Sequence, residues 1–255
     1  QGSVDARTGT RDLGISNQPF ASKTFNLVRQ MLFSLKAQEV ADEAIKELKA
    51  GNKPVIAIGN TMETFINDIG AVGTTTDKHD YSLTLVRGLT GLFRVTETDA
   101  NGERIQHEID KSIIGAEGLA KYAELEAKIN KLSSGISISP IDVIKAELSK
   151  AGYSVGEMTG RSNELVFNED GTATVSKRTN TDKKKLARDF NSGSIDVLIL
   201  NQSASTGISL HASNKFKDQR KRVMLFAQNQ LDVNTEVQMR GRIDRTGQVQ
   251  RGAYR

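Results

Sequence analysis

The chain has 255 residues, of which 37% are hydrophobic and 26% charged, and its formal net charge is +4. This length accommodates one large domain or two small ones, and the composition predicts a globular protein with a hydrophobic core. Cysteine is absent, which excludes disulfides and thiolate zinc sites. No apolar run approaches the roughly 20 residues of a membrane span, and no signal peptide is visible. We therefore expect a cytoplasmic protein with no membrane partner.

Residues 1–50 are predicted to be an N-terminal lead-in to the main domain. The first three residues, Gln1-Gly-Ser3, look like the remnant of a cleaved tag, so we expect the chain to be a piece of a longer protein. Residues 22–50 predict one long amphipathic helix that ends at Gly51. The apolar positions that recur at helical spacing are Leu27, Met31, Leu35, Ile45 and Leu48.

Two further elements follow this helix. Residues 53–58 form a short continuous apolar run between Gly51 and Gly59, which predicts a buried parallel strand. Thr61 is a candidate N-cap for a helix to about Ile69, with Met62 and Phe65 on its apolar face.

Residues 71–135 interrupt this rhythm and are predicted to be an insertion into the main sheet domain. Residues 93–97 and 104–109 alternate apolar and polar side chains around Asp99-Ala-Asn-Gly102, which indicates a hairpin. Residues 116–132 are rich in Ala, Glu and Lys and predict a helix.

The second half of the chain returns to alternating strands and helices. Ser139-Pro140 predicts a helix start with Ser at the N-cap and Pro at the first position, and Gly152 predicts its end. A polar hairpin is expected at 161–178, turning at 168–171. Strands are predicted at 153–158, 195–200 and 222–226, and helices at 182–190 and from Asp232 or Asn234 to Arg240.

This order of elements predicts an α/β fold, with a doubly wound, mostly parallel sheet flanked by helices. Ligands of such sheets bind at the carboxyl ends of the strands. The loops expected there are 59–61, 159–161 and 201–207, which are rich in Gly, Ser, Thr and Asn. Side chains and backbone of these types can donate hydrogen bonds to phosphates, so this edge is the predicted ligand site.

The C-terminal segment from Gln238 to Arg245 carries the most specific pattern. Gln238, Arg242 and Arg245 are spaced by four and three residues, which predicts one face of a helix. Gly241 between them is expected to let another backbone approach. Two guanidiniums on one stripe make a phosphate clamp. Two arginines at helical spacing alone would favour a solvated basic helix end, but the full Gln-x-x-Gly-Arg-x-x-Arg-x-Gly string favours the clamp.

Several blocks together resemble a known family. Gln238–Arg245 resembles motif VI of superfamily 2 helicases, residues 196–210 resemble motif V, and residues 55–60 stand where motif IV belongs. Ser205–Ala212, Lys217–Val223 and Glu157–Arg161 are similar to the strawberry-notch-type C-terminal domain, a branch close to the Swi/Snf-type motors. The resemblance implies that residues 51–255 form a second RecA-like domain.

The resemblance also implies a function: the C-terminal half of an ATP-dependent DNA helicase or translocase. Arg242 and Arg245 match the arginine fingers, and Gln238 and Gly207 would join them at the nucleotide. The residues expected to hold nucleic acid are Asn60, Thr61, Thr159, Gly160, Arg161, Ser205 and Thr206. Bacterial and phage relatives often carry such motors beside DNA methyltransferase modules, which implies a bacterial or phage-infected cytoplasm.

No Walker A or Walker B string occurs in the chain. ATP and Mg²⁺ are therefore expected to be bound mainly by a first RecA-like domain elsewhere in the protein, with no metal ligand here and no activity of this fragment alone. Two alternatives are a non-catalytic nucleic-acid-binding module and a scaffold domain in a phage or defence assembly. For His211, a structural role is favoured over a contact with nucleic acid.

Overall fold

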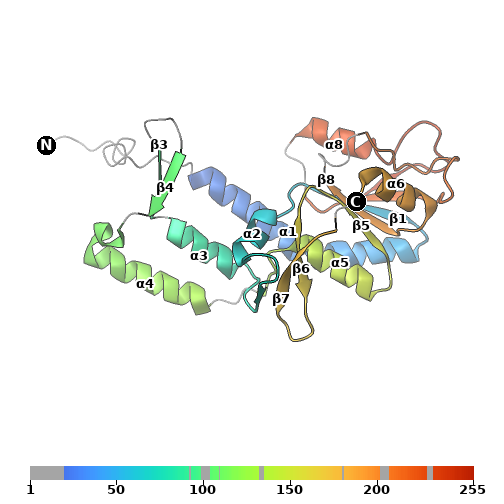
Figure 1. Cartoon of the computed structure of the whole chain (residues 1–255). Coiled ribbons are helices and arrows are strands. Elements are labelled where there is room, and N and C mark those ends of the chain that lie inside the picture. The colour runs from blue at the N-terminus through green and yellow to red at the C-terminus, as the bar shows by residue number, and fades with distance from the viewer. Residues whose placement is uncertain are drawn as a thin grey trace. The chain divides into compact units, whose positions relative to one another are not determined.

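The computed structural model describes residues 20–91, 93–98, 104–108, 110–131, 135–179, 181–201, 207–228 and 232–255. The chain divides into two compact units (Figure 1). One combines Asp80–Gly135 with the chain up to Arg29, and the other combines Gln30–His79 with Ile136–Arg255. The segment Asp80–Gly135 of the first unit thus lies within the predicted insertion at 71–135. Among the described helices, none has the length and apolar character needed to cross a bilayer.

The second unit is built on a five-stranded parallel sheet in the order β10-β9-β1-β8-β5. Its strand pairs, β1 with β8 and β9, β8 with β5, and β9 with β10, all run parallel, as predicted for an α/β doubly wound fold. The alternation along the chain is consistent with a RecA-like domain. The strands are β1 (Lys53–Ile58), β5 (Val155–Met158), β8 (Val197–Asn201), β9 (Arg222–Phe226) and β10 (Ala253–Tyr254).

Both faces of this sheet are buried, which explains why its strands are continuous apolar runs. On one face, Ile56 and Ile58 of β1 pack with helices α1 (Phe20–Lys49) and α5 (Pro140–Lys150). On the other face, Val55 and Ala57 pack with α6 (Lys183–Ser192) and α8 (Val233–Arg240). Successive side chains of a strand point to opposite faces, so β1 serves both cores.

The helix expected at 22–50 is confirmed as α1, but its apolar face was predicted only in part: Leu48 is buried and Ile45 packs against the same core, whereas Leu35 does not. Leu35 is 49% exposed, whereas a stripe of small side chains faces the sheet. Small side chains let the helix axis approach the sheet closely, so the alanines rather than the large residues set the interface. The buried stripe consists of Phe33, Ala37, Ala41, Ala44 and Leu48.

Two helix starts also differ in detail from the prediction. Helix α2 (Glu63–Ile69) begins after Met62, which has a positive φ of 61°, so Thr61 is not its N-cap. The helix at Pro140 is confirmed with Ser139 at the N-cap. However, the Ser139 hydroxyl donates to the Asp142 carboxylate at 2.6 Å instead of accepting from the backbone.

The other helix caps follow the expected chemistry. Asp182 accepts from the backbone N–H of Lys185 at the start of α6, and Gly193 closes that helix with a φ of 92°. Asp232, one of the two predicted caps of α8, accepts from the backbone N–H groups of Asn234 and Thr235.

The predicted hairpin at 161–178 is confirmed as β6 (Asn163–Phe167) and β7 (Ala173–Lys177). A short strand, β2 (Thr75–Thr76), pairs with β7 and makes a small antiparallel sheet of three strands. Neither β2 nor β10 was predicted, because two residues are too few to show a period.

The first unit holds α3 (Ser82–Gly91), β3 (Arg94–Thr98), β4 (Arg104–Glu108), the 3₁₀ helix η2 (Lys111–Ile114) and α4 (Gly115–Lys131). Strands β3 and β4 pair antiparallel, which confirms the predicted hairpin; its turn lies outside the described residues. Leu89, Phe93 and Tyr122 form a small core here, with the two rings edge-to-face at 5.2 Å.

Candidate nucleotide and nucleic-acid site

The loops after β1 and β9 are joined at the carboxyl edge of the sheet. The side-chain carbonyl of Gln228 accepts from the backbone N–H groups of Gly59 and Asn60, both at 2.9 Å. The Asn60 side chain accepts from Met62 N–H at 2.8 Å, which helps hold the left-handed turn before α2. Asn60 is exposed and Thr61 half-buried, so the structure leaves both near solvent at this edge.

Arg161 lies in a different environment from the one predicted for a nucleic-acid contact. It is 1% exposed, and its guanidinium donates to Asp142 at 2.5 and 2.8 Å and to Glu157 at 2.6 and 2.7 Å. Thr159, 4% exposed, donates its hydroxyl to Glu157 at 2.5 Å. Both side chains are thus buried and engaged, and a nucleic-acid backbone could not reach them. The adjoining Gly160 is exposed.

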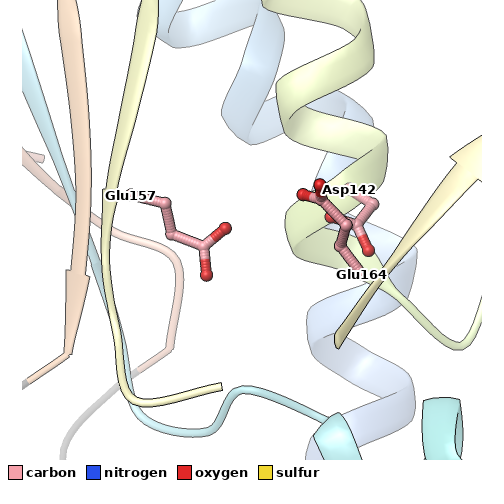
Figure 2. Close-up of side chains that lie close together, drawn as sticks. All are labelled: Asp142, Glu157 and Glu164. Carbon is pink, nitrogen blue, oxygen red and sulfur yellow. The ribbon is translucent and has the colours of Figure 1, made fainter. Parts of the chain in front are cut away.

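Three carboxylates meet in this region from three elements (Figure 2). Asp142 lies on α5, Glu157 on β5 and Glu164 on β6, and each has an oxygen within 4.8 Å of the others. Lys145 Nζ is hydrogen-bonded to Glu164 and lies 3.4 Å from Glu157.

Cations therefore already neutralise this cluster. Burial alone would raise the pKa of Glu157, but the hydrogen bond and charge of Arg161, with Lys145, outweigh it and hold the pKa at about 2. Arg178 adds a third positive charge, with its Nε 3.8 Å from Glu157. Three acids facing three bases make a structural ion network, so these residues do not fit a Mg²⁺ site.

The segment with the two predicted arginine fingers is a turn rather than a helix. Helix α8 ends at Arg240, and Gly241 to Ile243 form tight turns in which Arg242 N–H donates to Met239 C=O at 2.9 Å. The predicted helical stripe of Gln238, Arg242 and Arg245 is therefore wrong, because only Gln238 lies on the helix.

The turn nevertheless brings both arginines against residues 208–210. Arg242 C=O accepts from Leu210 N–H at 2.9 Å, and Arg242 Nη1 lies 3.4 Å from Ile208 C=O. Arg245 donates from Nη1 to the Ser209 hydroxyl at 2.8 Å and from Nε to a backbone carbonyl in its own turn. The two segments that resemble motifs V and VI are thus linked directly by hydrogen bonds.

Neither arginine has an acidic partner in any ion pair between described residues. Burial lowers the pKa of Arg242, and the charge of Arg245 lowers it further. Arg242 Nε is buried with no hydrogen-bond acceptor in the described part of the chain. By contrast, Arg161, Arg222 and Arg240 each pair with a carboxylate. A half-buried cation beside an exposed one, neither with a counter-ion among the described residues, is an arrangement that favours binding of an anion.

The remaining predicted residues surround this turn or lie outside the described part. Gly207 has a φ of 79°, so it needs the left-handed freedom of glycine, and Gln238 is exposed. Gly241 does not fulfil its predicted role: a Cβ there would meet only the carbonyls of Gln238 and Val237, at 3.5 and 3.6 Å, so no other segment approaches it. Ser205 and Thr206 fall outside the described residues.

His211 lies beside the same turn, half-buried, with its ring edge-on to Phe216 at 6.0 Å. Its Nδ1 is buried with no partner in the described part of the chain. Burial lowers the pKa of His211, and the charges of Arg245 and Arg222 lower it further. All three effects favour the neutral form of the ring.

Sequence reasoning missed two residues of this region, Gln228 and Ser209. Gln228 joins two strand ends, and Ser209 holds Arg245. Their only sequence signal is that each lies one or two residues beyond a predicted strand or glycine loop, which many structural residues share.

Residues 139–255 match the family model described as the C-terminal domain on strawberry notch homologues. Protein strawberry notch homolog 1 of Gallus gallus is 30% identical over 141 residues, which covers 51% of this chain and 11% of the relative. Protein strawberry notch of Drosophila melanogaster is 28% identical over 166 residues, covering 63% and 10%. The chain spans about a tenth of the length of these relatives. A search of solved structures gave no match.

Proposed function

We propose that this chain, whose residues 139–255 match the model of the strawberry notch C-terminal domain, is one half of an ATP-driven DNA motor. A first RecA-like domain elsewhere in the protein holds ATP and Mg²⁺. The present domain closes over the nucleotide and contributes two arginines, and it contacts the DNA backbone with its strand-end loops.

The observation that supports this proposal best is the uncompensated pair Arg242 and Arg245. A buried or half-buried arginine is normally paired, since removing its charge from water is costly. Here the guanidinium of Arg242 is partly desolvated and has no carboxylate partner in the described part of the chain, while the Ser209 hydroxyl and a carbonyl orient Arg245. The γ-phosphate of ATP is an anion that two such forks can bind, and its charge during transfer is stabilised by them.

For the contacts with DNA, we keep only part of the set of residues predicted from the sequence. Thr159 and Arg161 are withdrawn, because their side chains are buried in the ion network. Asn60, Thr61 and Gly160 remain among the described residues, and we assign the phosphate contacts to them. These are short polar loops at the edge where parallel sheets bind ligands.

The experiment is ATP turnover by the full-length protein with and without DNA. Arg242→Ala or Arg245→Ala should lower DNA-stimulated turnover by roughly 10³–10⁵-fold, the range for arginine fingers. Arg251→Ala, an exposed arginine of the same segment, is the matched control and should leave turnover unchanged. The 255-residue chain alone should not hydrolyse ATP, and Arg242-dependent hydrolysis by it would refute the half-site.

Ser209→Ala separates positioning from charge. This variant keeps both arginines but removes the hydroxyl that accepts from Arg245, so turnover should fall less than in Arg245→Ala while nucleotide affinity is nearly kept. If DNA affinity collapses in Arg242→Ala with turnover per bound complex unchanged, the arginines are DNA ligands, and the domain is a nucleic-acid-binding module.

A further inference from the structure

A second basic site lies between the C-terminal end of α6 and the loop before β9. A cavity of about 340 Å³ opens there, within the ~300–1,000 Å³ of ordinary ligand pockets. Its lining carries three cations, one aromatic ring and no carboxylate. The lining residues are Arg188, Asn191, Ser192, Lys215, Phe216 and Lys217.

No carboxylate of the described residues is paired with the two lysines of this cavity. The nearest acid in sequence, Asp218, already accepts from buried Lys53 at 2.5 Å and from Arg220 at 2.7 Å. Lys215 and Lys217 are exposed, and neither belongs to an ion pair between described residues. Because they lie in a loop, a helix dipole does not account for them either.

Arg188 completes the basic rim in a similar way. Its Nε lies 4.0 Å from Asp189, at the limit of an ion pair, and Lys185 binds the same carboxylate more closely at 2.7 Å. The Arg188 side chain is 73% exposed, so its guanidinium is available to an outside anion.

The loop holds an aromatic ring between the two lysines. Phe216 N–H donates to Ser213 C=O at 3.0 Å, and Lys215 N–H donates to the Ser213 hydroxyl at 3.2 Å. These bonds form a turn, and the edge-on contact with His211 orients the half-buried ring. Cations that track phosphates on either side of a ring that stacks with a base are the usual elements of single-strand binding.

We propose that this cavity binds a segment of single-stranded nucleic acid, with phosphates at Lys215, Lys217 and Arg188 and a base against Phe216. The choice of ligand rests on the proposed motor function. The site is distinct from the strand-end loops, which hold none of these residues. It adjoins the arginine pair through Asn191, whose side-chain amide donates at 3.1 Å to the carbonyl of Ser209, the residue that holds Arg245.

The test is binding of a labelled oligothymidylate to the 255-residue chain over a series of salt concentrations. Each phosphate contact to a single strand contributes about 0.7 to the slope of log K against log salt, so Lys215→Ala/Lys217→Ala should lower the slope by about 1.4. Lys49→Ala/Lys150→Ala is the matched control. It removes two exposed lysines from the ends of α1 and α5, which cover the opposite sheet face, and should not change the slope.

The aromatic ring is tested separately. Phe216→Leu should weaken binding roughly tenfold or more with little change in salt slope, because stacking on an aromatic ring is lost. Phe216→Tyr keeps a ring and should bind like the wild type, which excludes misfolding as the cause of the loss.

Three results would overturn the proposal. One is an unchanged slope in Lys215→Ala/Lys217→Ala. A second is displacement of the strand by a polyglutamate peptide that binds equally well to Phe216→Leu, which would indicate an acidic protein partner. A third is equal competition by free ATP, which would assign the cavity to mononucleotides. None of these depends on Arg242 and ATP turnover, so the motor function and this site can fail independently.

Discussion

The buried carboxylate of Asp218 provides a quantitative test of the ion network that it forms with Lys53, Arg220 and Arg222. It accepts from Lys53 at 2.5 Å, Arg220 at 2.7 Å and Arg222 at 3.4 Å. Lys53 is fully buried, and its Nζ lies over the ring of Phe190, 4.5 Å from the centroid. Asp218→Asn removes the counter-ion and should destabilise the fold by about 3–5 kcal/mol at neutral pH. That is a large part of the ~5–15 kcal/mol of a typical domain.

The penalty should also depend on pH in a known direction. Burial lowers the pKa of Lys53 from 10.5 to about 8, although the hydrogen bond from its ammonium to Asp218 opposes this shift. The folded state thus binds fewer protons than the unfolded state between about pH 8 and 10.5, so stability rises with pH in that window. Without Asp218 the pKa of Lys53 in the folded state falls further, so the pH range in which stability rises begins at a lower pH. The difference between variant and wild type should therefore shrink between about pH 7 and pH 9.5.

Urea unfolding followed by far-UV circular dichroism measures this, since the chain has no tryptophan. Glu43→Gln is the control, because its pairs with Lys46 at 2.9 Å and Arg255 at 3.8 Å join a half-buried carboxylate to exposed cations and should contribute at most about 1 kcal/mol. A loss below about 1 kcal/mol for Asp218→Asn at neutral pH would refute the reasoning. An equal loss at both pH values would refute the assignment of the penalty to the lysine.

Three other predictions concern glycines and acid pH. Gly252→Ala should destabilise the fold, since its Cβ would lie 2.9 Å from a side-chain carbon of Ile243, whereas Gly241→Ala, with a φ of −62° and contacts no shorter than 3.5 Å, should change the urea midpoint little. The pKa of Glu157 is held at about 2 against an ordinary 4.5, so its contribution to the free energy of unfolding is present above pH 4.5 and is lost as the pH falls toward 2. In Glu157→Gln, the free energy of unfolding should therefore depend less on pH in this window. The lowered pKa of His211 means that the folded state resists its protonation, so stability should decline as pH falls below 6.5, and His211→Gln should remove this decline; an unchanged profile would contradict the burial of the ring.

Local sequence patterns were sufficient for most of the fold. The run from Lys53 to Ile58 is apolar on both faces, and only a strand covered on both sides needs that. Pro140, Asp182 and Gly193 mark helix ends through their own backbone chemistry, so they could be located without knowing the rest of the structure. The order of the resembled motifs likewise depends on sequence alone, and the family match over 139–255 supports it.

The partners of each charge were decided only by tertiary structure. Arg161 and Arg242 look alike in sequence, since both follow a glycine in a polar segment beyond a strand or helix. In the folded chain Arg161 meets Asp142, 19 residues away, while among the described residues Arg242 meets a carbonyl oxygen and the charge of another arginine. Whether a cation is a structural ion pair or a ligand for an anion depends on which distant carboxylates the fold brings to it.

The face of a helix that is buried has the same dependence. In α1 both Leu35 and Ala41 are apolar, and local periodicity cannot choose between a stripe of large residues and a stripe of small ones. The alanines face the sheet because small side chains permit close packing of the helix. The sequence alone therefore predicted most of the elements, their order and the resemblance to the strawberry notch family. Which side chains face the core, and which cations remain for a phosphate, followed from contacts between residues that are far apart in the chain.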